Sequence, residues 1–323
     1  MKTHQYNTEI PHEVCRQFPC LERSKSVTLQ PASFSGARVW KVETAQQILA
    51  VKQWPMGHPV HMQLTEIHAM MNQARVEGLN CVPAVLPTYT GSTTVESQHQ
   101  YWDVCTWIPG EPCLNPSEEQ LKQIVRVISQ LHTIWRRMGH RVMTQCRAVQ
   151  IQHEKLLAWQ HGFFKAIPDL PVYAHAAETI QRYRASGLNA LGPWLSRKVG
   201  QHPCLADCRI EHFLFKDQLI TGIVDYGGMR YDHPAQDLAR LFGSMESVHP
   251  AIRSSALAEY GSTSSEFDQL RTLLETWGLL VAIGNWLTWL MKAKRAVSFI
   301  QEGERRLQFL LNRFCSLRNQ PVF

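Results

Sequence analysis

Residues Cys204–Arg240 read CLADCRIEHFLFKDQLITGIVDYGGMRYDHPAQDLAR, and most of what the sequence shows about fold and function rests on them. A loop leads into a short apolar strand, His212–Phe215. Lys216 and Asp217 form a tight turn, and Leu219–Val224 supplies a second apolar strand that ends in Asp-Tyr-Gly-Gly. Alternating apolar residues on both sides of a short polar turn predict a β-hairpin here.

Two carboxylates flank this predicted hairpin. Asp207 comes just before the first strand and Asp225 just after the second, 18 positions later. Because a hairpin brings the chain back to the end from which it started, we expect both carboxylates at the same end of a small sheet.

These residues resemble the aminoglycoside phosphotransferase and choline/homoserine kinase-like family, which has a protein-kinase-like fold. The family pattern runs H-G-D-x-x-x-x-N, a hairpin, I-D-[WFY]-[GE] and then D-P-x-x-D-L-A. The resemblance places Asp207 on the catalytic aspartate and Asp225 on the metal-binding aspartate, with the same spacing. It places Asp232–Ala239 on the last block, in which Asp237 is expected to brace the catalytic loop by hydrogen bonds.

Phosphoryl transfer explains why carboxylates stand at these two positions. The acceptor hydroxyl must be oriented and must lose its proton, a task that suits a carboxylate such as Asp207. Charge that develops on the phosphate oxygens is neutralised by a divalent metal ion, for which a hard oxygen ligand such as Asp225 is suited. The resemblance therefore implies ATP and Mg²⁺ or Mn²⁺ as cofactors.

The sequence departs from the family pattern in two places. Leu205-Ala206 replaces the usual His-Gly before Asp207, and His212 stands where the family has a metal-binding Asn. A neutral imidazole offers nitrogen in place of oxygen, which favours Mn²⁺ or Zn²⁺ over Mg²⁺.

Three interpretations of His212 follow. In the first, His212 binds the metal in an active kinase that favours Mn²⁺, and metal affinity fades below about pH 6.5. In the second, one metal on Asp225 is enough and His212 only packs or forms hydrogen bonds. In the third, the protein is a catalytically inactive nucleotide-binding or scaffold protein of the same fold, a pseudokinase.

The resemblance extends upstream to the parts of the fold that hold the nucleotide. It implies a phosphate-covering loop around Ser33–Val39, a phosphate-binding lysine on a strand, an ion-pair partner on the next helix, and an adenine-facing hinge. The residues expected in these roles are Ser35 and Gly36, then Lys52, then Glu66, and then Trp107 and Ile108. With them, the resemblance covers residues 28 to about 245.

The predicted fold class is α+β: a two-lobed protein-kinase-like fold with a small β-rich N-terminal lobe, 1–108, and a larger, mostly helical C-terminal lobe, 109–323. The pattern predicts a hairpin over 37–53, with strands at 38–42 and 48–52, and a helix over 61–76 with Met62, Ile67, Met70 and Met71 on its apolar face. Strands are expected near 92–96 and 101–108, and a break over 107–112.

The C-terminal lobe is expected to be helical apart from the hairpin at 212–225. Ser117 is a predicted N-cap for a helix that continues through Leu131. Residues 147–200 are expected to be mostly helical with loops near 162–171 and 187–193, and helices return from 254 to 318. His132 is expected to be a satisfied core histidine.

Composition excludes several classes of protein. The net charge of +6 over 323 residues is small and scattered, so no nucleic-acid partner is expected. No signal peptide is expected, because the first residues contain no apolar run. The longest apolar stretch, Trp277–Met291, is shorter than the 20 or so residues that cross a bilayer, so it predicts a buried helix and no membrane partner. Nine irregularly spaced cysteines indicate reduced thiols in a cytoplasmic protein.

Residues 202–212 also allow an alternative interpretation, a zinc site. His202, Cys204, Cys208 and His212 lie within 11 residues, although their spacing is unusual for zinc.

The sequence therefore predicts an ATP-dependent phosphotransferase, a kinase that transfers a γ-phosphate to a hydroxyl of a small molecule. No feature resembles the long activation segment with which protein kinases bind peptides, since Asp225 and Asp237 are only 12 positions apart. The residues single out neither a particular acceptor nor an oligomeric state.

Overall fold

The computed structural model describes residues 9–31, 36–57, 59–138, 142–160, 170–246, 248–292 and 297–318. The chain forms two compact units: the first comprises residues 1–112 and 212–227, and the second comprises 113–211 and 228–323. The lobe boundary expected after residue 108 stays a prediction. The predicted hairpin within Cys204–Arg240 belongs to the first unit, and the loop that carries Asp207 belongs to the second.

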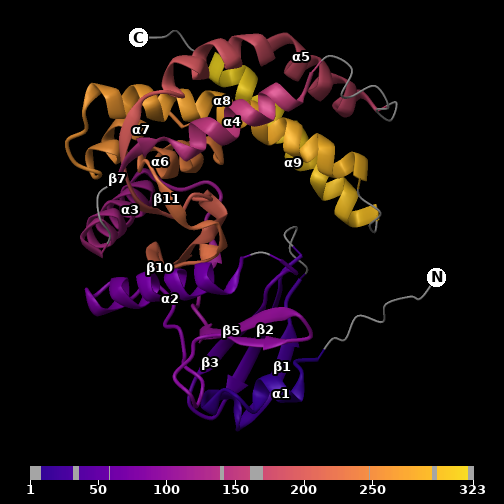
Figure 1. Ribbon diagram of the computed structural model, residues 1–323, viewed down its shortest axis with the longest axis vertical. Helices are drawn as coiled ribbons and strands as arrows, with labels where there is room; N and C mark the ends of the chain where they lie inside the picture. The colour runs from indigo at the N-terminus through magenta and orange to yellow at the C-terminus, as the bar shows by residue number, and fades with distance from the viewer. Residues whose placement is uncertain are drawn as a thin grey trace. The chain divides into compact units, whose positions relative to one another are not determined.

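The first unit is built on an antiparallel five-stranded sheet in the order β1-β2-β3-β5-β4 (Figure 1). A second sheet has the order β10-β9-β6. The strands are Ser24–Leu29 (β1), Arg38–Thr44 (β2), Ile48–Gln53 (β3), Val95–Ser97 (β4), Gln100–Thr106 (β5), Glu111–Pro112 (β6), Phe213–Lys216 (β9) and Leu219–Ile223 (β10). The helices are His12–Cys15 (α1), Pro19–Leu21 (η1) and His61–Val76 (α2).

The predicted hairpin over 37–53 is confirmed as β2 and β3. The Thr44 side chain closes its turn by accepting hydrogen bonds from the backbone amides of Gln46 and Gln47. Alternate residues of both strands point into the core, where Trp40 and Trp102 stack with ring centroids 5.2 Å apart. Burial of such large aromatic side chains dominates the stability of a small sheet.

Helix α2 forms over the predicted residues, but one of its expected core positions is wrong. Ile67, Met70 and Met71 are buried, whereas Met62 is 75% exposed. Leu64 takes the inward position because it lies 3 residues before Ile67, while Met62 lies on the opposite side of the helix.

The second predicted hairpin is confirmed as β9 and β10. Asp217 and Gln218 form its turn with φ angles of +50° and +68°, which matches the turn type that suits a twisted hairpin. The break expected over 107–112 holds only to residue 110, because β6 pairs with the edge of β9. An edge strand tolerates Pro112, and Gly110 leaves no room for a Cβ, which would lie 2.5 Å from Thr221 Oγ1.

The second unit is mainly helical, as expected. Its helices are Glu118–Met138 (α3), Arg147–Ala158 (α4), Pro171–Leu191 (α5), Gly192–Trp194 (η2), Ala235–Gly243 (α6), Pro250–Ala258 (α7), Ser265–Lys292 (α8) and Val297–Arg318 (α9). At the start of α3 the predicted N-cap forms a reciprocal capping box: the Ser117 hydroxyl accepts from the Gln120 amide, and the Gln120 side chain accepts from the Ser117 amide.

Two expectations for the second unit are wrong. It contains a three-stranded sheet in the order β11-β8-β7, formed by Val142–Gln145 (β7), Lys198–Cys204 (β8) and Arg230–Asp232 (β11). Helix α5 also continues through Gly187, where a loop was expected. A Cβ at Gly187 would lie 2.6 Å from Leu156 Cδ1 and 2.9 Å from Trp277 Cε3, so this glycine serves close helix packing and does not end the helix.

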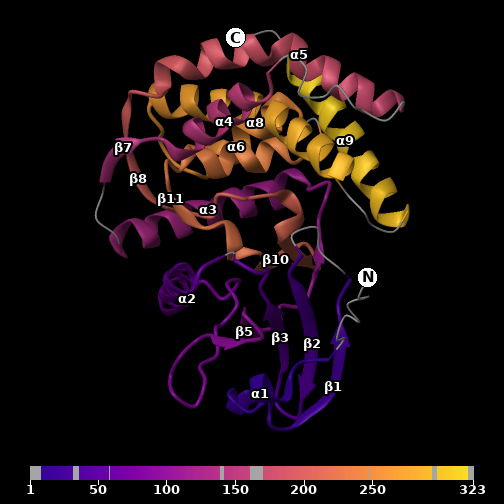
Figure 2. The same cartoon turned by 45° about the vertical axis from the view of Figure 1, so that its right-hand side comes forward.

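Helix α8 is the centre of the second unit and packs against α4, α5, α6 and α9 (Figure 2). The apolar stretch Trp277–Met291 lies within it, as predicted for a buried helix, and Leu280, Ile283 and Leu287 are fully buried. Among the described helices, none has the length and hydropathy needed to cross a membrane.

Candidate active site

Lys52 and Asp225 meet in the first unit although 173 positions separate them. Lys52 lies on β3, opposite Asp103 of β5, and its Nζ is 3.5 Å from Asp225 Oδ1. The same Nζ lies 3.6 Å from the centroid of the Trp54 ring. The aromatic face and the carboxylate together hold the ammonium group in place.

Asp225 follows β10 and begins the turn Tyr226–Gly228 (η4). Its φ angle of +65° is unusual for a residue with a side chain. His212, at the end of the turn Ile210–His212 (η3), is buried, and its Nε2 lies 3.8 Å from Asp225 Oδ2. One carboxylate oxygen of Asp225 thus faces a cation, and the other lies beside an imidazole nitrogen.

A buried network that the sequence pattern does not reveal fixes Trp54 beneath Lys52. Trp54 Nε1 donates to Asp103 Oδ2 at 2.5 Å, and His68 Nε2 lies 3.2 Å from the same oxygen. His68 Nδ1 is 2.8 Å from Thr93 Oγ1. A Cβ at Gly227 would lie 2.7 Å from the Trp54 ring, so the turn after Asp225 packs on the same tryptophan.

The expected ion pair between Glu66 and Lys52 is not formed. Glu66 is exposed, and Lys52 pairs with Asp225. The reason is the orientation of α2, which turns His68 toward the sheet, whereas Glu66 lies outside its buried face.

Gly36, Trp107 and Ile108, which are also expected to bind the nucleotide, lie in loops. Gly36 has a φ angle of +82°, and among the described residues other than its chain neighbours no atom lies within 4 Å of where its Cβ would be. Ser35 lies outside the described residues. The backbone N–H of Trp107 donates to the Ile48 carbonyl at 2.9 Å, so it is committed within the sheet and unavailable to adenine. Ile108 packs its side chain over Gly222 of β10.

Asp207 lies in the loop after β8 in the second unit, and its carboxylate is held by two arginines. Arg240 Nε donates to Asp207 Oδ1 at 2.9 Å, and Arg209 Nε lies 3.3 Å from Oδ2. A Cβ at Gly228 would lie 3.1 Å from both the Asp207 Cβ and the Leu205 carbonyl oxygen. The turn after Asp225 therefore contains a glycine where it passes the Asp207 loop.

Asp237 braces this loop through the backbone. Its two carboxylate oxygens accept hydrogen bonds from the amides of Leu205 and Ala206 at 2.8 and 2.7 Å. His132 Nε2 lies 2.8 Å from Asp237 Oδ2, and its Nδ1 lies 2.8 Å from the Tyr260 hydroxyl. Because the brace uses backbone amides, Leu205-Ala206 can replace His-Gly without its loss. His132 is a buried, satisfied histidine, as expected.

The zinc alternative finds no support among the described residues. His202, Cys204 and Cys208 do not converge as a ligand group. The Cys204 thiol instead donates to the carbonyls of His202 and Asp232, and burial raises the pKa of the Cys204 and Cys208 thiols, which disfavours the thiolates that zinc requires. All nine cysteines are free thiols.

Arg209, Arg240, Trp54 and His68 are site residues that the sequence did not reveal. Only Arg240 has a sequence feature that indicates a place in the site: it directly follows the Asp-Leu-Ala block, one helical turn from Asp237. The others become neighbours of the predicted residues only through the fold.

The sequence matches the phosphotransferase enzyme family over residues 28–273, and the chain belongs to this family. The family resemblance seen in the sequence is thereby confirmed. No curated protein matches the sequence.

Solved structures show the same fold at low sequence identity. Spectinomycin phosphotransferase in complex with ADP and spectinomycin has a TM-score of 0.66 and 11% identity, covering 92% of this chain and 94% of its own. Amicoumacin kinase in complex with AMP-PNP and Ca²⁺ has a TM-score of 0.65 and 10% identity, covering 93% and 92%. A microcompartment-associated aminopropanol kinase has a TM-score of 0.64 and 13% identity, covering 91% and 94%. The protein-kinase-like α+β fold expected from the sequence is confirmed.

Proposed function

We propose that the protein is an ATP-dependent phosphotransferase that moves the γ-phosphate of ATP to a hydroxyl of a small molecule. The observation that carries the proposal is the meeting of Lys52 and Asp225, at 3.5 Å, in a member of the phosphotransferase family. A lysine for phosphate and a carboxylate for metal are the two charges that a bound nucleotide triphosphate requires. Known structures of this fold contain ADP and AMP-PNP, which agrees with a nucleotide ligand.

Lys52 would bind the phosphates of ATP, with Ser35 and Gly36 in the loop that covers them. The positive φ angle and open surroundings of Gly36 suit a backbone that approaches phosphate oxygens closely. The Trp107 carbonyl and the backbone of Ile108 would face adenine.

The residues present fit a divalent metal ion. Asp225 would supply a carboxylate oxygen, and His212, whose Nε2 lies 3.8 Å from Asp225 Oδ2, would supply a nitrogen ligand. When bound, Mg²⁺ or Mn²⁺ would neutralise the charge that develops on the phosphate oxygens. Nitrogen from His212 favours Mn²⁺.

Asp207 would orient the acceptor hydroxyl and take its proton as the oxygen attacks the γ-phosphorus and ADP leaves. Arg240 and Arg209 fix the direction of its carboxylate, and the Asp237 brace fixes the loop.

A second candidate is a catalytically inactive nucleotide-binding protein. The ion pairs that Asp207 forms with Arg209 and Arg240 favour it, because both carboxylate oxygens are engaged by guanidinium groups where an active enzyme would need one to accept a proton from the acceptor hydroxyl. This candidate predicts ATP binding without transfer.

Thermal unfolding with ATP tests the nucleotide site. A ligand at one hundred times its Kd stabilises the folded state by about 2.7 kcal/mol, or roughly 5–10 °C for a protein of this size. We expect a shift with ATP plus Mg²⁺ or Mn²⁺ that EDTA or Asp225→Asn removes. The matched control is Asp217→Asn, in the β9–β10 turn of the same unit. No shift at millimolar ATP contradicts the proposal, and a shift indifferent to metal favours the inactive protein.

A further inference from the structure

Within the second unit, a cluster around Asp207 contains more arginines than carboxylates. Three arginines, Arg209, Arg240 and Arg306, face two carboxylates, Asp207 and Glu211. Arg209 Nη1 lies 3.0 Å from Glu211 Oε1, and Arg306 Nη2 lies 3.3 Å from the same oxygen. One carboxylate oxygen is thus shared by two guanidinium groups, and the cluster keeps a net charge of +1.

Arg306 extends this cluster from α9, near the C-terminal end of the chain. Its pKa is lowered chiefly by burial; Glu211 acts against the shift, and Arg209 and Arg240 add to it. An arginine remains charged at neutral pH despite such a shift. Its side chain is 21% exposed, so a dissolved anion can reach a charge that its neighbours only partly neutralise.

A cavity of about 200 Å³ in the second unit is lined in part by Arg240, another arginine of the cluster. Arg240 both lines this cavity and holds Asp207. Gln236, one helical turn earlier on α6, also lines the cavity and donates to the Ala206 carbonyl at 3.3 Å. The cavity and the Asp207 loop are therefore neighbouring parts of one site.

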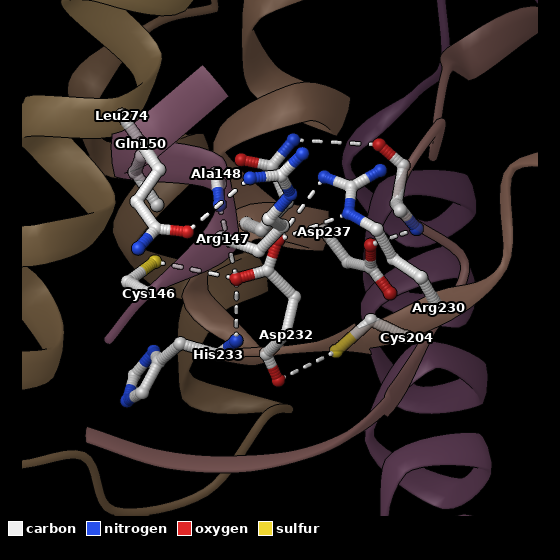
Figure 3. Close-up of polar contacts among 12 residues, drawn as sticks. Cys146, Arg147, Ala148, Gln150, Cys204, Arg230, Asp232, His233, Asp237 and Leu274 are labelled. Carbon is white, nitrogen blue, oxygen red and sulfur yellow. Dashed lines mark hydrogen bonds and ion pairs between the residues drawn. The ribbon is translucent and has the colours of Figure 1, made fainter. Parts of the chain in front are cut away.

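A second arginine on the cavity wall is held by a buried carboxylate. Figure 3 shows Asp232 among Cys146, Ala148, His233 and Arg230, with dashed lines to each of them. Asp232 Oδ1 accepts from the first three, and Oδ2 accepts from Arg230 Nε and Nη2 at 3.2 and 3.0 Å. Asp232 is fully buried. Its ion pair fixes the guanidinium group of Arg230 at the wall of the cavity.

Among the described residues that line the cavity, Glu275 carries a carboxylate, and cations surround it. Glu275 is 2% exposed and accepts from Arg253 Nη1 at 2.9 Å and from Arg313 Nη2 at 3.1 Å. Arg271 Nη1 lies 3.6 Å from its other oxygen. Three guanidinium groups on one carboxylate leave no negative charge to attract a cationic ligand.

Two acceptor atoms in the cavity have no partner. Gln236 Oε1 and Gln152 Oε1 are buried without a hydrogen bond among the described residues. Both amides have their orientation fixed, since each Nε2 donates to a backbone carbonyl, of Ala206 and of Leu274. A buried carbonyl oxygen without a donor destabilises the folded state, and hydroxyl groups of a ligand would supply the missing donors.

We propose that the phosphate acceptor is an anionic polyol, a molecule with several hydroxyl groups and a carboxylate or phosphate group. This inference rests on the proposed phosphotransferase function and names the substrate class for it. Arg240, Arg230 and Arg306 would attract the anionic group, and the oxygens of Gln236 and Gln152 would accept hydrogen bonds from hydroxyls. A cationic amino alcohol would meet the surplus positive charge beside Asp207.

The test uses a matched set of six-carbon chains with ATP and Mn²⁺: gluconate, glucitol 6-phosphate, neutral glucitol and cationic glucamine, each at 20 mM. Thermal unfolding reports binding, and ³¹P NMR reports transfer. We expect at least one of the two anions to bind at least tenfold more tightly than glucitol or glucamine. The two anionic compounds distinguish a carboxylate acceptor from a phosphate acceptor.

Arg306→Gln provides the mutational test. It removes a charge from the cluster and should reduce affinity for the preferred anion about tenfold. Arg305→Gln is the matched control, because the adjacent Arg305 is 74% exposed and pairs with Glu302 on its own helix. Preference for glucamine or glucitol, binding of no anion, or equal anion affinity in Arg306→Gln overturns the inference. If ATP still shifts the unfolding temperature in those cases, the proposed phosphotransferase function stands and only the substrate class is wrong. If ATP gives no shift, the proposed function itself is contradicted.

Discussion

At the scale of the residue, Asp225 shows how the fold holds a functional group in an unusual backbone conformation. Its φ angle of +65° costs a residue with a side chain about 1 kcal/mol. Lys52 at 3.5 Å and the tight approach of Gly227 to Trp54 hold the conformation. We interpret this strain as the cost of directing one carboxylate toward both a lysine and an imidazole.

His212 allows a prediction about metal preference. If its imidazole binds the metal, wild type should show a larger ATP-dependent thermal shift with Mn²⁺ than with Mg²⁺. His212→Asn restores an oxygen donor, so Mg²⁺ should then support the shift as well as Mn²⁺. His212→Ala should weaken the apparent affinity for Mn²⁺ by about tenfold or more.

The matched control for this prediction is His175→Ala on α5, whose side chain is exposed. An identical ratio of Mn²⁺ to Mg²⁺ shifts in wild type, His212→Asn and His212→Ala would show that His212 only packs against Asp225. Metal would then be held without it.

Individual site residues were predictable where a short pattern carries them. Asp207 and Asp225 flank a hairpin that the sequence predicts, and Lys52 ends a clear strand. Trp54 and Asp103 were not predictable as their partners, because they become neighbours only through the pairing of β3 with β5, whereas Arg240 has a sequence signal in its position directly after the Asp-Leu-Ala block.

At the scale of the element, α3, β8 and the segment after β11 bring three histidines together. His132 and His202 have ring centroids 5.1 Å apart, and both line a polar cavity of about 340 Å³ with His233. The pKa of His202 and of His233 is lowered to about 4, chiefly by burial and further by the charge of His132.

This cluster predicts a loss of stability in acid. In the unfolded chain a histidine has a pKa near 6.5, so as pH falls the unfolded state binds protons before the folded state does. The stabilising contribution is therefore complete above about pH 6.5 and decreases as pH falls toward 4. After allowance for partial solvent exposure, each histidine accounts for about 1–3 kcal/mol.

Urea unfolding at pH 7 and pH 4.5 measures this effect. His202→Phe cannot take up a proton and should lose less free energy of unfolding between the two pH values than wild type does. Exposed His175→Gln is the control and should match wild type. An equal loss in His202→Phe and wild type would show that this histidine does not contribute.

Elements differ in how well their sequence predicts them. The β2–β3 hairpin, α2 and the β9–β10 hairpin follow local patterns of apolar residues and turn chemistry, and the structure confirms them. The strands β7, β8 and β11 were missed because their partners lie far apart in the chain, as with Cys204 opposite Arg230. Gly187 misled the prediction because close packing on Leu156 and Trp277, and not a turn, requires a glycine there.

At the scale of the whole molecule, each compact unit carries one part of the proposed chemistry. The first unit has the lysine and carboxylate suited to nucleotide and metal, Lys52 and Asp225. The second has Asp207 on a braced loop beside a cationic cavity. The family assignment was visible in the sequence because its pattern is concentrated in Cys204–Arg240. The arginine surplus was not visible, because it gathers residues from 209 to 306.

The most direct test of the central claim is phosphoryl transfer itself, followed by ³¹P NMR in a mixture of ATP, Mn²⁺ and small alcohols that includes gluconate and glucitol 6-phosphate. Wild type should convert ATP to ADP and a phosphomonoester in equal amounts. Asp207→Asn should slow transfer about one hundredfold or more while keeping the ATP-dependent thermal shift, and Asp217→Asn should behave as wild type. Nucleotide binding without any phosphomonoester in wild type, or equal transfer in Asp207→Asn, would contradict the claim that Asp207 serves an active phosphotransferase.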